Sequence, residues 1–122
     1  MTSMLIVDDS QQVLTFLKQV FEDKGFEVFT TNSGIEAIHS VKTHCPDHIY
    51  SDINMPEMDG FKLAELIYKK FNQEVTLMTA TNLELLDKKD FTKLGVYKII
   101  HKSTFVDDVA YILNKQLKAT EH

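Results

Sequence analysis

The sequence predicts an α/β protein in which a five-stranded parallel sheet is covered by helices on both faces. Short apolar runs alternate five times with segments whose apolar residues recur at helical spacing. Runs such as MLIV and VTLM are almost continuously apolar, as expected of strands covered on both sides. Because parallel neighbours need right-handed crossover connections, the alternation indicates one doubly wound domain of 122 residues.

In the first half of the chain, strands are expected at residues 3–7 and 26–30, each followed by a helix. The first helix has an apolar face made of Val13, Phe16, Leu17, Val20 and Phe21. Gly25 can end it, because glycine readily adopts the left-handed conformation found after helices. Ser33 to Glu36 form a capping-box pattern that opens a helix with Ile35, Ile38 and Val41 on one face. Pro46 cannot continue that helix.

In the second half, strands are expected at residues 48–51, 75–78 and 97–101. Asp59 can cap a helix whose apolar face is Leu63, Leu66, Ile67 and Phe71. A weaker helix is predicted from Leu83 to Leu94 with Gly95 as its stop. It lacks a clean apolar stripe, which favours a wet surface helix over a docking face. Thr104 is expected to cap a last helix that buries Val106, Val109, Ala110, Leu113 and Leu117.

Composition excludes several classes of protein. The formal charge is −5 and all thirteen basic residues are lysines, which argues against a nucleic-acid surface. The apolar run at residues 4–7 is too short for a signal peptide or a membrane span. Cys45 is the single cysteine, so no internal disulfide can form and a reducing, cytoplasmic location is expected.

Charged and polar residues follow the strands at the edge where ligands bind in open α/β sheets. The set is Asp8 and Asp9 after the first strand, Asp52 after the third, Thr79 after the fourth and Lys102 after the fifth. Each has an ordinary alternative interpretation: the two aspartates could cap the first helix, the threonine could serve a turn, and the lysine could be a surface residue. Their convergence at one edge by topology favours a functional site.

Three carboxylates in one place require neutralisation, since two of them ~4 Å apart repel by about 4 kcal/mol at an effective dielectric of ~20. Lys102 supplies one positive charge, and a divalent cation would supply two more. Ligands that are all oxygens favour Mg²⁺ or Mn²⁺ over zinc, and Mg²⁺ commonly binds carboxylates together with a phosphate. The Lys102 ammonium and the Thr79 hydroxyl are suited to phosphoryl oxygens.

The segments LIVDDS, SDINMPEMDG, MTA and HKS, at these separations, resemble the receiver domain of two-component response regulators. The resemblance covers residues 4 to about 117 and implies a flavodoxin-like (βα)5 sheet with strand order 2-1-3-4-5. It implies that the whole chain, 1–122, is a single receiver domain without an output domain. It also implies a signalling domain rather than an enzyme, which catalyses only its own phosphorylation and slow dephosphorylation.

The resemblance assigns a role to each site residue. Asp52 is the phosphoacceptor, and its donor is a phosphohistidine on a sensor histidine kinase or a histidine phosphotransfer protein. Asp8, Asp9, Asp52 and the backbone carbonyl of Asn54 hold Mg²⁺. Thr79 and Lys102 contact the phosphoryl oxygens and transmit the presence of the phosphoryl group to the rest of the domain. The downstream target is left open, and a phosphorylation-dependent dimer is admitted.

Two positions depart from the receiver pattern. Ser103 follows the lysine where receivers typically have proline, and Ile99 stands where they often have an aromatic residue. A haloacid-dehalogenase-type phosphohydrolase is the main rival, but it needs a general-acid aspartate where this chain has Asn54. A flavin-binding module is disfavoured because Asp8 and Asp9 would repel its phosphate, and a receiver-like scaffold without phosphorylation is disfavoured because every site residue is present. The HCPDH segment, residues 44–48, lacks the ligand spacing of a zinc site.

Overall fold

The computed structural model of the protein describes residues 1–109 and contains the predicted parallel sheet. Its strands are β1 (Ser3–Val7), β2 (Glu27–Thr31), β3 (His48–Asp52), β4 (Val75–Thr79) and β5 (Val96–His101). They lie in the order β2-β1-β3-β4-β5, and all neighbouring pairs are parallel. The predicted fold class and strand order are confirmed, and each strand end lies within about one residue of its prediction.

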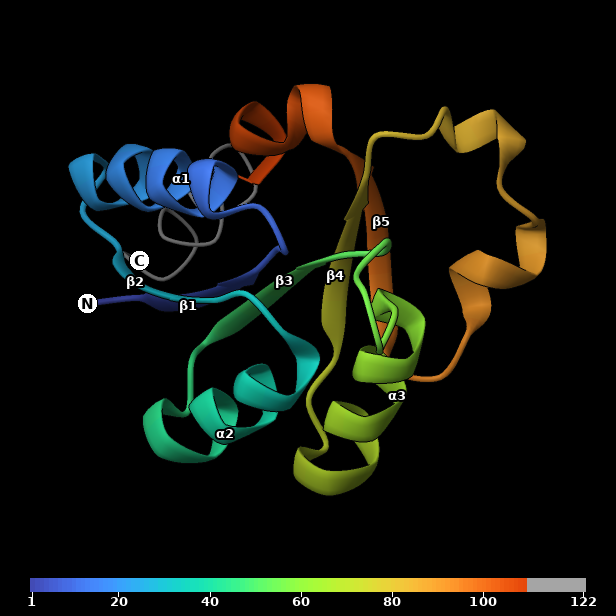
Figure 1. The fold of residues 1–122 in the computed structure, drawn as a ribbon, viewed down its shortest axis with the longest axis horizontal. Coiled ribbons are helices and arrows are strands. Elements are labelled where there is room, and N and C mark those ends of the chain that lie inside the picture. Colours follow the sequence, from blue (N-terminus) through green and yellow to red (C-terminus); the bar gives the residue numbers. More distant parts are fainter. Residues whose placement is uncertain (110–122) are drawn as a thin grey trace, which may run out of the picture.

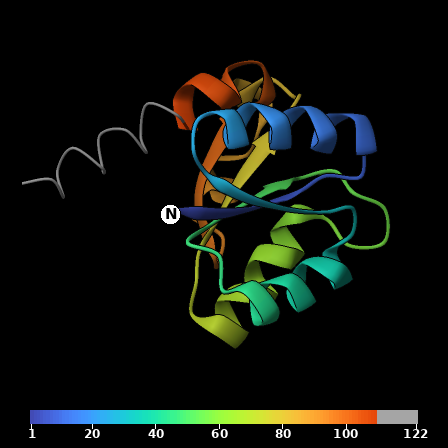
Figure 2. The same ribbon diagram turned by 90° about the vertical axis from the view of Figure 1, so that its left-hand side faces the viewer.

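Helices cover both faces of the sheet (Figures 1 and 2). α2 (Gly34–His44) and α3 (Gly60–Phe71) lie on one face. α1 (Gln11–Asp23) lies on the other face, together with a helical segment at residues 105–109. Three residues predicted for the last helix, Ala110, Leu113 and Leu117, lie outside the described residues. Within residues 1–109, no helix has both the length and the apolar composition needed to cross a membrane.

The predicted helix ends are set by short-range hydrogen bonds. The Ser33 side chain accepts from the Glu36 N–H at the start of α2, and the Asp59 carboxylate accepts from the Lys62 N–H at the start of α3. Gly25 follows α1 with a φ of 96°, and the next amide, that of Phe26, donates to the Phe21 carbonyl. The first two bonds satisfy amides at helix starts, and the third satisfies a carbonyl at a helix end, none of which has a partner within its helix.

Side-chain alternation along the strands divides the core into two clusters. Leu5, Ile49 and Leu77 point toward α2 and α3. Met4, Ile6, Tyr50, Met78 and Ile100 pack instead with the buried face of α1 and with Phe105 and Val109. Both clusters are needed because a sheet of parallel strands must be shielded on its two faces.

Two residues predicted on buried helix faces are exposed. Phe16 of α1 is 60% exposed and Ile35 of α2 is 59% exposed. Each residue turns a helix by about 100°. Phe16 therefore points away from the side of α1 that carries Leu14 and Phe21, and Ile35 points away from the side of α2 that carries Ala37 and Val41. Leu14, which the spacing argument overlooked, is buried in α1 together with Leu17 and Phe21.

The predicted helix from Leu83 to Leu94 is wrong. That region forms two short 3₁₀ helices, Leu83–Leu85 and Lys88–Thr92, separated by extended backbone at Leu86. The side chains of Asn82 and Asp87 each accept a hydrogen bond from an amide two residues ahead. Such local bonds compete with a continuous helix. The segment also has no apolar stripe whose packing would stabilise one.

Candidate functional site

Strand alternation brings three ionisable side chains to one face of the sheet at its carboxyl edge. Asp8, Asp52 and Lys102 each lie two residues beyond a member of the core cluster under α1, namely Ile6, Tyr50 and Ile100. Residues two apart on a strand point to the same side. The apolar cluster thus forms the floor beneath a charged group.

Lys102 connects the two buried carboxylates. Its Nζ lies 2.9 Å from Asp8 Oδ2 and 3.2 Å from Asp52 Oδ2. Asp8 is fully buried and Asp52 is 5% exposed, whereas the lysine side chain retains 28% exposure. One ammonium therefore faces two carboxylates in a partly dehydrated place, where the group carries excess negative charge.

Asp9 adds a third carboxylate, so the three predicted acidic residues do come together. Oxygens of Asp8, Asp9 and Asp52 lie within 4.8 Å of one another, and Asp9 is the exposed member. Asp8 Oδ2 is buried without a well-directed hydrogen bond, although the lysine ammonium is close to it. An all-oxygen set with an incompletely satisfied oxygen has the chemistry that a hard divalent cation requires, and the residues fit Mg²⁺.

Backbone amides orient the two buried carboxylates. The Ser10 N–H donates to Asp8 Oδ1 at 2.9 Å, and the Asn54 N–H donates to Asp52 Oδ1 at 3.3 Å. The Ser10 side chain, rather than either aspartate, accepts the Val13 N–H at the start of α1. The alternative interpretation of Asp8 and Asp9 as helix caps therefore fails. The role predicted for the Asn54 carbonyl stays a prediction.

Gly60 lets the start of α3 lie against the backbone of Asp52. Its amide donates to the Ile53 carbonyl at 2.8 Å. A Cβ at this position would lie 2.5 Å from the Asp52 carbonyl oxygen and 2.9 Å from the Ile53 Cα. Real Cβ atoms do not approach backbone so closely, so only glycine fits without displacing the Asp52 backbone.

Thr79 lies at the end of β4, next to the strand that carries Asp52. Asp52 pairs with Met78 in the sheet register, so Thr79 is one residue further along the neighbouring strand. The threonine is 1% exposed, and its hydroxyl oxygen accepts the Thr81 N–H at 3.0 Å. Because the oxygen is the acceptor in that bond, the hydroxyl proton can be donated elsewhere.

Burial raises the pKa of Asp52, and the neighbouring Asp8 carboxylate adds to the rise, while Lys102 and the Asn54 amide oppose it. Burial by itself would lower the pKa of Lys102, but its contacts with Asp8 and Asp52 raise it above the usual value. The lysine therefore stays a cation. Ionisation of Asp52 costs more free energy in the folded protein than in the unfolded chain.

We expect that cost to appear as a pH dependence of stability in metal-free buffer. Because the pKa of Asp52 is raised on folding, the folded protein binds this proton more tightly than the unfolded chain does. Its contribution to stability is therefore lost as the pH rises above the ordinary value of about 4. Asp52→Asn should gain stability relative to the wild type between about pH 4 and about pH 7. Urea unfolding of both proteins in EDTA measures the difference, and a difference that is constant across this range would contradict the assignment.

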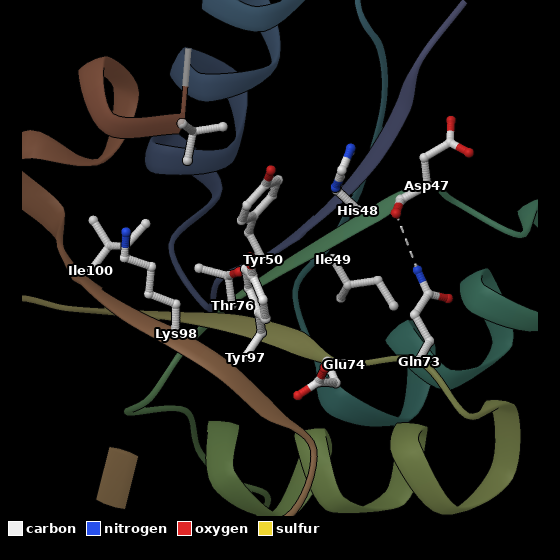
Figure 3. Close-up of a pocket in the computed structure, with 11 residues that line it drawn as sticks. Asp47, His48, Ile49, Tyr50, Gln73, Glu74, Thr76, Tyr97, Lys98 and Ile100 are labelled. Atoms are coloured by element: carbon white, nitrogen blue, oxygen red, sulfur yellow. Dashed lines mark hydrogen bonds between the residues drawn. The ribbon is translucent and has the colours of Figure 1, made fainter. Parts of the chain in front are cut away.

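A cavity of about 260 Å³ lies away from this edge, near the amino-terminal ends of β3, β4 and β5 (Figure 3). Its lining includes His48, Tyr50, Tyr97 and Lys98. Burial lowers the pKa of His48, against the opposing effect of Asp47. The convergent ionisable groups expected of a reactive site are at the carboxyl edge. We therefore place the candidate site at that edge.

The segment from His44 to His48 does not gather its ring and thiol groups. The His44 ring stacks on Phe29 with centroids 3.9 Å apart, and Cys45 takes the left-handed position that ends α2. His48 opens β3, where its ring lies near that of Tyr50. Among residues 1–109, the group formed by Asp8, Asp9 and Asp52 is the one cluster suited to a metal ion.

With the sheet order and this acidic edge established, comparison with known proteins identifies the class. Residues 4–114 match the response regulator receiver domain family, and the chain belongs to that family.

Particular relatives sharpen the placement. The chain is 33% identical over 120 residues to the chemotaxis protein CheY of Listeria monocytogenes, covering 97% of this chain and 100% of CheY. It is 38% identical over 104 residues to a protein-glutamate methylesterase/protein-glutamine glutaminase of Rhodospirillum rubrum, covering 84% of this chain but 28% of that protein. A structure of the response regulator TrrA of Thermotoga maritima with Mg²⁺ and BeF has a TM-score of 0.80 at 27% identity, covering 94% of this chain and 98% of TrrA. This chain thus spans the full length of some relatives and about a quarter of others.

Two residues near the site escaped the sequence argument. Ser51 is fully buried and donates its hydroxyl to the Asp52 carbonyl at 3.0 Å. His101, the last residue of β5, makes hydrogen bonds to Ala80 and to Ser103. A polar residue inside an apolar strand and a histidine next to the lysine were the available indications.

Proposed function

We propose that this domain accepts a phosphoryl group on Asp52 from a phosphohistidine of a partner protein, in a reaction that depends on Mg²⁺. The observation that carries the proposal is the gathering of the Asp8, Asp9 and Asp52 carboxylates in one place, with the Lys102 ammonium in contact with two of them, Asp8 and Asp52. The donor would be a sensor histidine kinase or a histidine phosphotransfer protein. Asp8, Asp9, Asp52 and the Asn54 carbonyl would hold the metal ion, and Mg²⁺ is the cation that the donor set favours.

Each residue has a chemical task in this transfer. An oxygen of Asp52 attacks phosphorus in line, an O–P bond forms, and the N–P bond of the phosphohistidine breaks with its electron pair returning to the imidazole. Lys102 keeps the attacking carboxylate ionised and then faces the new phosphoryl oxygens. Thr79 donates its free hydroxyl proton to one of them. The bound metal ion supplies neutralisation of the charge on the transferred group.

The same geometry suggests how the signal leaves the site. After transfer, Lys102 and Thr79 share a new anion that neither faces in the resting domain, and this biases the domain toward a second conformation. The domain then acts as a signalling module that catalyses only its own phosphorylation and slow dephosphorylation. A hydrolase of the haloacid-dehalogenase type is disfavoured because Asn54 offers no titratable proton to a leaving group.

The test is incubation with Mg²⁺ and acetyl phosphate, followed by intact mass measurement. We expect the wild type to gain one phosphoryl group and Asp52→Asn to gain none. Asp87→Asn is the matched control, because Asp87 caps a distant 3₁₀ turn and asparagine can replace it there. EDTA should block the gain, and beryllofluoride should mimic the modified state. A folded wild type that stays unmodified, or equal modification of Asp52→Asn, would overturn the proposal.

A further inference from the structure

His101 joins the segment that follows Thr79, here called the Thr79 loop, to the turn that begins at Lys102, the Lys102 turn. In the sheet register His101 is the partner of Thr79 on the neighbouring strand. Its Nε2 lies 3.1 Å from the carbonyl oxygen of Ala80, the residue after Thr79. Its Nδ1 lies 3.1 Å from the backbone nitrogen of Ser103 and 2.7 Å from the Ser103 hydroxyl oxygen. One imidazole thus spans from the end of β4 to the turn that begins at Lys102.

The partners of the ring define its tautomer. The Ala80 carbonyl can only accept a hydrogen bond, so the proton between it and the ring must be on Nε2. The Ser103 backbone N–H can only donate, so Nδ1 must be unprotonated. The ring is therefore neutral and protonated at Nε2, with Nδ1 facing Ser103 as an acceptor.

We propose that His101 is a positioning residue for phosphoryl transfer, whose neutral ring holds the Thr79 loop and the Lys102 turn in register. This inference rests on the proposed function of Asp52. Lys102 belongs to the 3₁₀ turn Lys102–Thr104, and the Ser103 amide in that turn is bound by the ring. The Ala80 carbonyl, in the residue after Thr79, accepts a hydrogen bond from Nε2 of the same ring. Small displacements of groups that must meet the transferred phosphoryl group reduce the rate strongly.

Features particular to this chain give the bridge its importance. Ser103 has a backbone N–H, which a proline at this position would lack. This N–H donates the hydrogen bond that Nδ1 of the His101 ring accepts. Ile99, two residues earlier on the same face of β5, is 4% exposed and sits in the apolar core without a polar atom to offer. The segment after Ala80 lacks the predicted long helix and consists of short turns. The imidazole is therefore the polar side chain of β5 that links the strand to the Thr79 loop.

The bridge is tested first by NMR of the ¹⁵N-labelled histidine rings, which reports the tautomer without any phosphorylation. We expect His101 to be the neutral Nε2–H form near neutral pH, with Nδ1 unprotonated. The exposed His39 of α2 is the internal control, and its ring should show the tautomer mixture of a solvated imidazole. A similar mixture at His101 would overturn the bridge.

Variants then separate the two halves of the bridge. His101→Gln can keep a donor toward Ala80, His101→Asn can keep an acceptor toward Ser103, and His101→Leu keeps neither. With acetyl phosphate and saturating Mg²⁺, we expect the leucine variant to be phosphorylated about tenfold more slowly than the wild type and the two amide variants to fall between. Mg²⁺ affinity should stay within about twofold in all three, since no proposed ligand changes. General damage to the fold would instead lower affinity and rate together.

The outcomes distinguish this inference from the function on which it rests. A wild type that is phosphorylated together with a leucine variant of equal rate would overturn the role of His101 alone. A wild type that is never phosphorylated would overturn both, and the NMR result would then show whether the bridge exists as a purely structural tie. A joint loss of Mg²⁺ affinity and rate in the amide variants would also count against a positioning role.

Discussion

Lys102→Met is expected to lower the free energy of unfolding by about 2–4 kcal/mol in metal-free buffer at neutral pH. The substitution keeps most of the side-chain volume but removes the ammonium that lies 2.9 Å from Asp8 and 3.2 Å from Asp52. Both carboxylates are buried, so they would be left without their cation where water cannot replace it. The estimate is below that for a fully buried pair because the lysine side chain is 28% exposed and partly screened.

Mg²⁺ should restore much of this loss, because a bound cation replaces the missing charge and binds only the folded protein. Urea unfolding with EDTA and with Mg²⁺, for wild type and variant, measures both effects. Lys18→Met, on the exposed surface of α1, is the matched control and should change stability by less than about 0.5 kcal/mol. A Lys102→Met protein as stable as the wild type in EDTA would show that the lysine does not neutralise the buried pair.

Gly60→Ala is expected to destabilise the domain by about 2–4 kcal/mol and to slow phosphorylation of Asp52. The added Cβ would overlap the Asp52 carbonyl oxygen at 2.5 Å and the Ile53 Cα at 2.9 Å. These are backbone atoms of the acceptor residue and its neighbour, so relief of the overlap requires movement of the acceptor itself. Loss of stability and loss of rate should therefore occur together.

Gly25→Ala separates steric overlap from the ordinary cost of replacing a glycine. Gly25 has a φ of 96°, but a Cβ there would meet no atom within 4 Å. Its replacement should cost about 1 kcal/mol through backbone strain and leave phosphorylation unchanged. Chemical unfolding and phosphorylation rates of both variants provide the comparison. Equal stability losses in the two variants would mean that the contact between α3 and Asp52 is looser than the structure shows.

Local patterns were sufficient for most of the fold. The five strands, the caps at Ser33 and Asp59 and the stop at Gly25 all depend on residues a few positions apart, so their physical causes can be read along the chain. The prediction of a helix at residues 83–94 was wrong, and the cause is also local. Its apolar residues do not repeat on one face, and Asn82 and Asp87 each start a separate turn.

The acidic edge was predictable because the order of strands and crossover helices decides where the strand ends lie. Once the strands alternate with crossover helices, their carboxyl ends must lie at one edge, and alternation decides which side chains share a face there. The strand ends alone placed Asp8, Asp9, Asp52, Thr79 and Lys102 at that edge, whereas their alternation between faces was read from the structure. The burial of Phe16 and Ile35 was predicted wrongly because helical spacing among apolar residues is compatible with more than one face, and the face that packs on the sheet is set by tertiary contacts.

The chain's residue pattern was enough to specify the parallel sheet and the convergence of carboxylates with one lysine, because hydrophobic period and turn chemistry act over short distances along the backbone. The folded arrangement was needed to show that Lys102 bridges two carboxylates at once and that the His101 ring reaches the Ala80 carbonyl, 21 residues away in sequence. Such contacts depend on how neighbouring strands end and on the rotamers that packing permits, and no periodicity in the sequence encodes either.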